Sequence, residues 1–239
     1  MFSLISTASR LLTRRRVIRA ETQKILPSLA GKDFTALRQK YSDARWSKFL
    51  QIKPHLPIGI MWELNLIGTP PLRVLDIGCG AGLFMYCLKY HGHDAIGTDI
   101  DDPLLAGLAE IYGVDRRAGP VLPFTPLQIE GKFDLITCIQ TYFDRPNPHN
   151  KHWWGRAEWH YFLTDMAGKL SPQGRIFLRI NRSKHDAEVL AALHTKRRRR
   201  REIILDRNAL ETGLQKLAAQ RPAKPVELRS ATPSRKHRP

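Results

Sequence analysis

Short apolar runs alternate with helical patterns through the middle of the chain. Four of these runs are typical of strands that are buried on both faces of a parallel sheet, at residues 74–77, 94–100, 133–140 and 175–181. Between the runs, apolar residues recur every three or four positions, which predicts helices that each pack one face on the sheet. This alternation predicts an α/β fold, doubly wound around a mainly parallel sheet.

Capping residues predict where two of these helices begin and end. Asp102 followed by Pro103 suits an N-cap and a first helical position, and Gly113 suits the end of the same helix. The helical pattern that begins at Leu83 stops at Gly92 in the same way. Asp102 therefore has a structural role, which leaves the neighbouring acids available for other roles.

The last third of the chain predicts smaller elements. The segment L-S-P-Q-G at residues 170–174 predicts a turn between a helix and the fourth apolar run. Beyond that run we expect a short helix, a short strand, a helix capped by Asp206 and a closing strand, at residues 187–193, 203–205, 208–219 and 226–229.

Composition divides the chain into one domain with basic flanks. We expect a basic N-terminal segment at residues 1–33, a helical cap at residues 34–66 and the main domain at residues 67–230. Within the main domain, residues 182–202 form a basic insert, and residues 231–239 form a basic disordered tail. A domain of this length can bury a substantial core.

The first strand leads into a glycine-rich turn, V-L-D-I-G-C-G-A-G at residues 74–82. Its three glycines permit a tight strand-to-helix turn and leave backbone amides open to a ligand. A dinucleotide fingerprint would need a further glycine where Leu83 stands, and Asp76 would repel a pyrophosphate. A carboxylate here favours a ligand that carries a cation, such as an ammonium group.

This turn resembles the first motif of the class I S-adenosylmethionine-dependent methyltransferases, a hydrophobic strand followed by D/E-x-G-x-G-x-G. The match over these positions is complete. The resemblance implies a Rossmann-like, seven-stranded type of sheet and S-adenosylmethionine as the cofactor. It also implies that the acid and the turn hold the methionine portion of that cofactor, which assigns this role to Asp76, Gly78, Cys79, Gly80 and Gly82.

Two further positions complete the predicted cofactor site. Asp99 ends the second strand about 20 residues after the glycine turn, the spacing of acids that bind a ribose. The resemblance implies that Ile100 packs on the adenine, and Gln140 should border the methyl-transfer site because it ends a neighbouring strand. Many relatives have an acid that binds the adenine amino group where this chain has Ala118, so adenine recognition is not assigned.

The loop after residue 140 is rich in histidine and tryptophan, which favours binding of the methyl acceptor. His149, His152 and His160 are candidate bases, but none is singled out, and the catalytic residue is unknown. The chain lacks the N-P-P-Y type of tetrapeptide used by DNA adenine methyltransferases, which favours a small-molecule acceptor. No spacing indicates a metal site.

The net charge of +17 comes from the flanks of the chain. Residues 196–201 are six consecutive cations, which form a solvated insert or contact phosphates of RNA or of an anionic membrane surface.

The first twenty residues carry five arginines and no acid, as in a mitochondrial presequence or a basic interfacial helix. We expect a cytoplasmic protein by default, and a mitochondrial one if the source is eukaryotic. No apolar window is long enough for a membrane span.

Three readings of the function remain open. The first is a methyltransferase that acts on a small molecule by in-line transfer. The second is an RNA methyltransferase that uses the basic flanks, and the third is a cofactor-binding subunit without catalysis. The cysteines do not separate these readings, because Cys79, Cys87 and Cys138 have no paired spacing and suit reduced packing positions.

Overall fold

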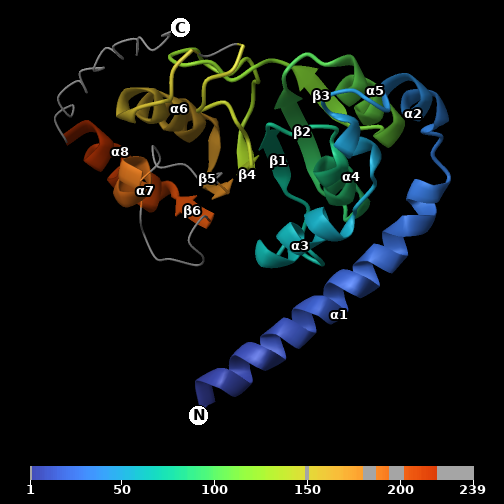
Figure 1. Cartoon of the computed structure of the whole chain (residues 1–239). Helices are drawn as coiled ribbons and strands as arrows, with labels where there is room; N and C mark the ends of the chain where they lie inside the picture. Colours follow the sequence, from blue (N-terminus) through green and yellow to red (C-terminus); the bar gives the residue numbers. More distant parts are fainter. Residues whose placement is uncertain (1, 149–150, 180–186, 194–201, 220–239) are drawn as a thin grey trace, which may run out of the picture.

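The computed structural model shows one sheet between two layers of helices (Figure 1). It describes the chain except for residues 1, 149–150, 180–186, 194–201 and 220–239. The described strands form a six-stranded sheet in the order β3-β2-β1-β4-β5-β6. They are β1 (Arg73–Ile77), β2 (Asp94–Asp99), β3 (Asp115–Ala118), β4 (Phe133–Ile139), β5 (Leu170–Arg179) and β6 (Glu202–Asp206).

The sheet confirms the predicted α/β class. Each neighbouring pair from β3 to β5 is parallel, and β6 runs antiparallel to β5. The chain order reverses direction across the sheet between β1 and β4, which makes the carboxyl ends of these strands the topological switch point. Six strands are described, and the predicted strand at residues 226–229 lies outside the described residues.

Helices cover both faces of the sheet. One face is covered by the segments before β1 and by the helices that follow β1 and β2, and the other by the helices after β4. The first group is α1 (Phe2–Ala30), α2 (Thr35–Tyr41), the 3-10 helix η1 (Ser47–Leu50), α3 (His55–Glu63), α4 (Leu83–Tyr90) and α5 (Pro103–Tyr112). The second group is α6 (Arg156–Lys169), α7 (Ala187–Leu193) and α8 (Arg207–Ala219).

The predicted caps are confirmed. Asp102 accepts hydrogen bonds from the backbone N–H groups of Leu104 and Leu105 at 3.0 and 3.1 Å, at the start of α5. Gly113 ends that helix with a φ of +68°, and Gly92 follows α4 with a φ of +85°. Both glycines adopt the left-handed conformation that ends many helices.

The turn predicted at residues 170–174 is wrong, because β5 already begins at Leu170. The register of β5 against β4 shifts between Phe133 and Leu135, so the extra residues form an irregular stretch within the strand. A Cβ atom on Gly174 would lie 2.7 Å from the carbonyl oxygen of Phe133 and 3.1 Å from the backbone nitrogen of Ser171. The glycine therefore allows β5 to approach β4 closely and allows the irregular stretch to fold back on itself.

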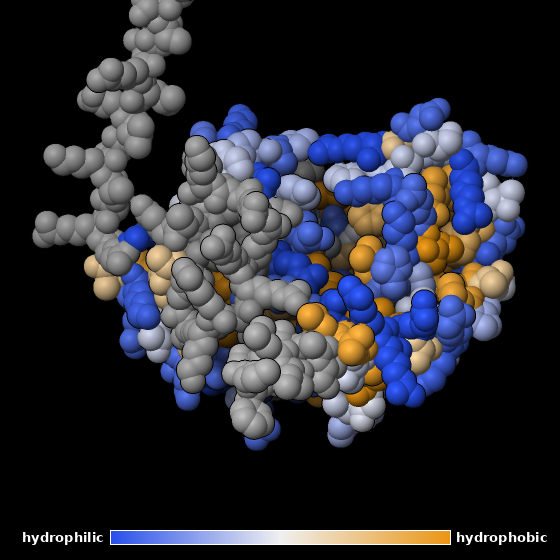
Figure 2. Space-filling model, turned by 60° about the horizontal axis from the view of Figure 1, so that its bottom comes forward, coloured by the Kyte–Doolittle hydropathy of each residue, from blue (hydrophilic) through white to orange (hydrophobic). Residues whose placement is uncertain are grey.

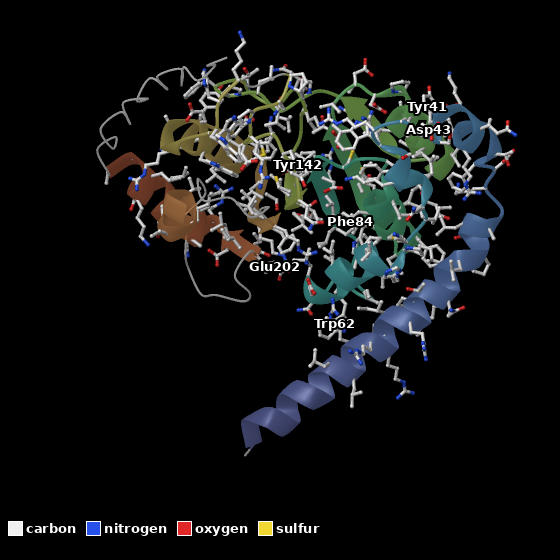
Figure 3. All side chains as sticks on the ribbon, viewed as in Figure 1. Tyr41, Asp43, Trp62, Phe84, Tyr142 and Glu202 are labelled. Carbon is white, nitrogen blue, oxygen red and sulfur yellow. The ribbon has the colours of Figure 1, made fainter. Side chains whose placement is uncertain are left out.

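Helix α1 extends beyond the body of the molecule at its N-terminal end (Figure 1). Its C-terminal half is anchored by Ile25 and Leu29, which are buried in the core. Further along, Arg14 donates to Glu63 of α3 at 2.9 Å, and Glu63 also accepts from Arg179 of β5 at 2.6 Å. Arg179 also donates to Glu202 of β6, which lies near α3 in Figure 3. These charged groups connect α1 and α3 to the edge of the sheet.

Candidate functional site

The glycine turn lies at the carboxyl end of β1 and folds back against β2. The backbone N–H groups of Gly78 and Cys79 both donate to the carbonyl of Thr98, at 2.8 and 3.1 Å. Gly78, Gly80 and Gly82 have φ values of +73°, +57° and +84°. A residue with a Cβ rarely adopts these values, so the turn requires glycine at each position.

Side chains of the protein pack directly on these glycines. A Cβ atom on Gly78 would overlap the methyl group of Thr141, which follows β4. On Gly80 it would lie 2.8 Å from the ring of Phe49, in η1. The turn is therefore bordered by the segment after β4 and by the helical segment that precedes β1. The sequence predicted that residues 34–66 cap the cofactor site and that the residues after the third apolar run border it, but it did not indicate these particular contacts of Phe49 and Thr141 with the glycines.

Asp76 is buried within the sheet, with 3% of its surface exposed. The hydroxyl of Thr137, its partner in the register of β4, donates to Asp76 Oδ1 at 2.6 Å. Burial raises the pKa of Asp76 to about 7, the charge of Asp99 contributes to that rise, and the Thr137 hydrogen bond opposes it. Near pH 7 this carboxyl group is therefore poised between its neutral and charged forms.

Asp99 connects the glycine turn to the end of β2. Its Oδ2 accepts from the N–H of Gly80 at 2.6 Å, and its Oδ1 accepts from the N–H of Ile100 at 2.7 Å. Burial raises the pKa of Asp99, while these two hydrogen bonds and the guanidinium of Arg116 act in the opposite direction. A carboxylate has about four lone-pair sites, so two backbone bonds leave Asp99 able to accept hydroxyl donors as well.

The other predicted residues lie around this centre in different ways. The buried Cys79 side chain packs against Gly97 of β2, so Cys79 contributes its backbone, and not its side chain, to the surface of the turn. Gln140 follows β4 with an exposed side chain and a φ of +54°, and its N–H donates to Arg179 at 2.8 Å. Ile100 is partly buried against the helical layer that contains α4 and α5.

The structure thus brings Asp76, the glycine turn, Asp99 and the Gln140 segment together at the ends of β1, β2 and β4. Gly82 differs from the other two glycines because it is the N-cap of α4. A Cβ on Gly82 would lie 2.6 Å from the side chain of Val114. Its role in the structure is to join the turn to the helix.

The loop after β4 carries aromatic and cationic side chains. Tyr142 is 51% exposed, and Figure 3 places it on the β4 side of the molecule. The guanidinium of Arg145 lies over the rings of Tyr142 and Trp153, at 5.0 and 5.2 Å from their centroids. Beneath the loop, four rings pack together in the core: Phe143, Trp154, Trp159 and Phe162.

The structure singles out no base among the three histidines. His149 lies outside the described residues, His152 is exposed, and His160 is partly buried on α6. Among the described residues, no group of three His, Cys, Asp or Glu side chains is arranged to hold a metal ion.

A family model described as "Methyltransferase domain" matches residues 13–220. This span contains all six described strands and every described helix, including most of α1. The chain belongs to this methyltransferase family. Membership confirms the resemblance predicted from the glycine turn at the end of β1.

Several curated members of the methyltransferase family are similar in sequence. The chain is 27% identical over 145 residues to the ubiquinone biosynthesis O-methyltransferase of Dechloromonas aromatica, which covers 56% of this chain and 56% of that protein. It is 30% identical over 124 residues to the enzyme of the same name from Bordetella avium, covering 49% of this chain and 50% of that protein. The chain spans about half the length of the curated relatives it matches.

Solved methyltransferase structures also resemble this chain. One is the S-adenosylmethionine-bound amino pentose methyltransferase CalS10 from Micromonospora echinaspora, with 20% identity and a TM-score of 0.43 over 58% of this chain and 55% of that chain. Another is a TehB-like methyltransferase from Corynebacterium glutamicum, with 18% identity and a TM-score of 0.40 over 83% of this chain and 82% of that chain.

Proposed function

We propose that this chain transfers a methyl group from S-adenosylmethionine to a hydroxyl group of a small molecule. The observation that carries the proposal is the arrangement at the ends of β1 and β2, where Asp99 holds the amide of Gly80 beside the buried Asp76. Family membership supports methyl transfer. The relatives named as ubiquinone biosynthesis O-methyltransferases support an oxygen acceptor.

The residues at this site fit the proposed cofactor. Asp76 is a buried acid, and no cation of the described residues contributes to its pKa, so an ammonium group would supply the missing opposite charge. Asp99 retains the capacity to accept bonds from the two ribose hydroxyls. Ile100 would pack on the adenine, and the backbone of residues 78–80 would face the methionine portion.

The chemistry comes from the sulfonium group, which supplies an electrophilic methyl carbon when the cofactor is bound. The acceptor would contribute its hydroxyl oxygen as the nucleophile, a neutral thioether would be the leaving group, and the hydroxyl proton would pass to water or to a base. The task of this chain is then to hold both reactants in line and to limit water, which can remove much of the barrier without a dedicated acid or base. Gln140 and Thr141 border the place where the acceptor would approach.

A labelled-methyl experiment tests this proposal. The protein is incubated with S-adenosylmethionine carrying a radioactive methyl group and with cell extract, which is then divided into small-molecule, nucleic-acid and protein fractions. We expect label in the small-molecule fraction, and a loss of that label in Asp99→Ala but not in Asp101→Ala, which removes the same charge from an exposed neighbour. Label in RNA would establish the RNA methyltransferase reading. Cofactor binding without any transfer would establish the non-catalytic one.

We further propose that α1 binds an anionic membrane surface. In the N-terminal part of α1, Leu11 and Leu12 are 46% and 67% exposed, and Arg15, Arg16 and Arg19 are exposed in the next two turns. Exposed leucines among arginines suit a lipid interface, where the apolar side chains enter and the cations meet phosphates. Hydrophobic side chains also reach the surface between hydrophilic ones on the face shown in Figure 2. No described helix is long and apolar enough to cross a membrane.

Vesicle sedimentation tests this second proposal. We expect binding to vesicles that contain phosphatidylglycerol, none to pure phosphatidylcholine, and a loss of binding when Leu11 and Leu12 are both replaced by serine. Replacing Arg38, Lys40 and Lys53 by glutamine is a control that removes three exposed cations elsewhere. Binding that follows total charge alone, or that RNA abolishes by competition, would contradict a membrane-specific role for α1. The cytoplasmic location stays a prediction.

A further inference from the structure

Arg116 of β3 contacts the same two residues that Asp99 contacts. Its Nε donates to the carbonyl of Gly80 at 3.0 Å, and its Nη2 donates to the carbonyl of Ile100. Asp99 accepts from the N–H groups of those residues. The amide and the carbonyl of both residues are therefore held by two side chains of opposite charge.

This arrangement joins three strands at the proposed cofactor site. Gly80 belongs to the turn after β1, Ile100 follows β2, and Arg116 lies in β3. The paired register of the parallel strands β1 and β2 ends at Ile77 and Thr98, and the last backbone bonds between them are those from Gly78 and Cys79 to the carbonyl of Thr98. Beyond that point, the contacts of Asp99 and Arg116 fix the distance between the turn and the segment that begins at Ile100.

Arg116 also offsets the negative charge gathered at this end of the sheet. The charged and titratable groups that face Asp99 are Asp76 of β1, Cys79 of the turn, Asp102 at the start of α5 and Arg116 itself. Arg116 is the cation among them, and it opposes the rise that burial produces in the pKa of Asp99. Without Arg116, Asp99 would be protonated at a higher pH.

We infer that Arg116 is a positioning residue of the cofactor site: it sets the spacing between the glycine turn and Ile100, and thereby places Asp99, which binds both of these segments. This inference rests on the proposed function. It assigns no contact between Arg116 and the reacting atoms. Arg116 acts through Asp99 and through the backbone of Gly80 and Ile100.

The neighbouring Arg117 provides a matched control. It lies on the same strand, is exposed, and donates to Asp115 at 3.1 and 3.3 Å. The test compares Arg116→Met, which keeps the aliphatic stem, with Arg116→Lys, which keeps the charge, and with Arg117→Met. Two quantities are measured on the full chain: amide hydrogen exchange at Gly80 and Ile100 without ligand, and the dissociation constant of S-adenosylmethionine at pH 6.5 and 8.5.

In Arg116→Met we expect exchange at both amides to become about tenfold faster, because the segments that carry them are no longer held together. The dissociation constant should rise about tenfold at pH 8.5 and further at pH 6.5, because Asp99 becomes easier to protonate. Arg116→Lys should restore the pH dependence of the unmodified chain but only part of the affinity. Arg117→Met should match the unmodified chain.

Unchanged exchange and unchanged affinity in Arg116→Met would overturn the inference. So would an equal loss of affinity at both pH values together with a general loss of stability, since that describes a purely structural residue. If the unmodified chain fails to bind S-adenosylmethionine, the proposed function falls. Faster exchange confined to Gly80 and Ile100 in Arg116→Met would in that case still support the role of Arg116 in placing the turn.

Discussion

The ends of β1 and β2 differ from the end of β4 in how they are built. At β1 and β2, hydrogen bonds of the backbone hold the site in place: Gly78 and Cys79 donate to the carbonyl of Thr98, and Asp99 accepts from the amide of Gly80. At β4, large side chains such as Tyr142 and Arg145 form the surface. In the proposed function, the cofactor meets the backbone side and the acceptor meets the side-chain side, and side chains on such a loop can vary without disturbing the backbone of the turn.

The largest effect on cofactor affinity is expected for Gly78→Ala, which changes the backbone of the glycine turn after β1. The substitution forces a Cβ into a φ of +73° and into the methyl group of Thr141. Strain of this kind costs about 1 to 3 kcal/mol, to which the overlap adds. We expect binding of S-adenosylmethionine to weaken by at least about 100-fold, measured by calorimetric titration, with a lower free energy of unfolding.

Gly92→Ala is the matched control for that substitution. Gly92 has a φ of +85°, and a Cβ on it meets nothing within 4 Å. It should lower the free energy of unfolding by about 1 kcal/mol and leave cofactor binding unchanged. When Thr141 is already alanine, Gly78→Ala should weaken cofactor binding by less than it does in the unmodified chain, because the methyl group that the new Cβ would overlap is gone. If Gly78→Ala and Gly92→Ala had equal effects on cofactor binding, the close contact between Gly78 and Thr141 would not matter for the site.

A smaller effect is expected for Asp76→Asn, which removes the buried charge from the same region. An ammonium group binds the charged form of Asp76, whose pKa is about 7 in the free protein. The affinity for S-adenosylmethionine should therefore rise from pH 6 to pH 8 in the unmodified chain. In Asp76→Asn the affinity should be about tenfold lower at pH 8, with a flatter pH dependence. An identical pH profile in both proteins would remove Asp76 from the site.

The same pKa has a consequence for stability. Because folding raises the pKa of Asp76 from about 3.9 in an unfolded chain to about 7, its contribution to stability is full below about pH 4 and is lost as the pH rises toward 7. The loss amounts to at most about 1.4 kcal/mol per pH unit in that window. Asp76→Asn should make the free energy of unfolding, measured with urea between pH 4 and pH 8, less dependent on pH.

The smallest effect on the cofactor is expected for Tyr142→Ala, on the β4 side. Tyr142 is half exposed and outside the core, so the free energy of unfolding should change by no more than about 0.5 kcal/mol. The dissociation constant of S-adenosylmethionine should be unchanged, while KM for the acceptor should rise. A change in cofactor binding as large as that of Asp76→Asn would mean that the two regions do not divide the reactants.

The sequence predicted the backbone side well because its signals are local. The conformations of Gly78, Gly92 and Gly113 and the cap at Asp102 depend on residues that lie a few positions apart. The spacing from the turn to Asp99 is fixed in the same way, by the length of one helix and one strand. Such features follow from the backbone preferences of glycine and from the unsatisfied amides at helix ends.

Contacts between distant segments were not predictable in this way. Arg116 lies in a short, mostly exposed strand, and nothing in its neighbours along the chain indicates that it reaches Gly80 and Ile100. Phe49 and Thr141 likewise meet the glycine turn only through the folding of the whole domain. The segment at residues 170–174 had the composition of a turn, but pairing with β4 made it part of β5, since tertiary contacts override local preference.

The central claim, that the ends of β1 and β2 bind S-adenosylmethionine, is tested most directly by calorimetric titration of three proteins: the unmodified chain, Asp99→Ala and Asp101→Ala. The two variants lose the same charge from residues two positions apart, one bonded to the glycine turn and one exposed. We predict saturable binding to the unmodified chain and to Asp101→Ala, with affinity at least about tenfold lower in Asp99→Ala. Equal affinity in all three proteins, or no binding to the unmodified chain, would contradict the account.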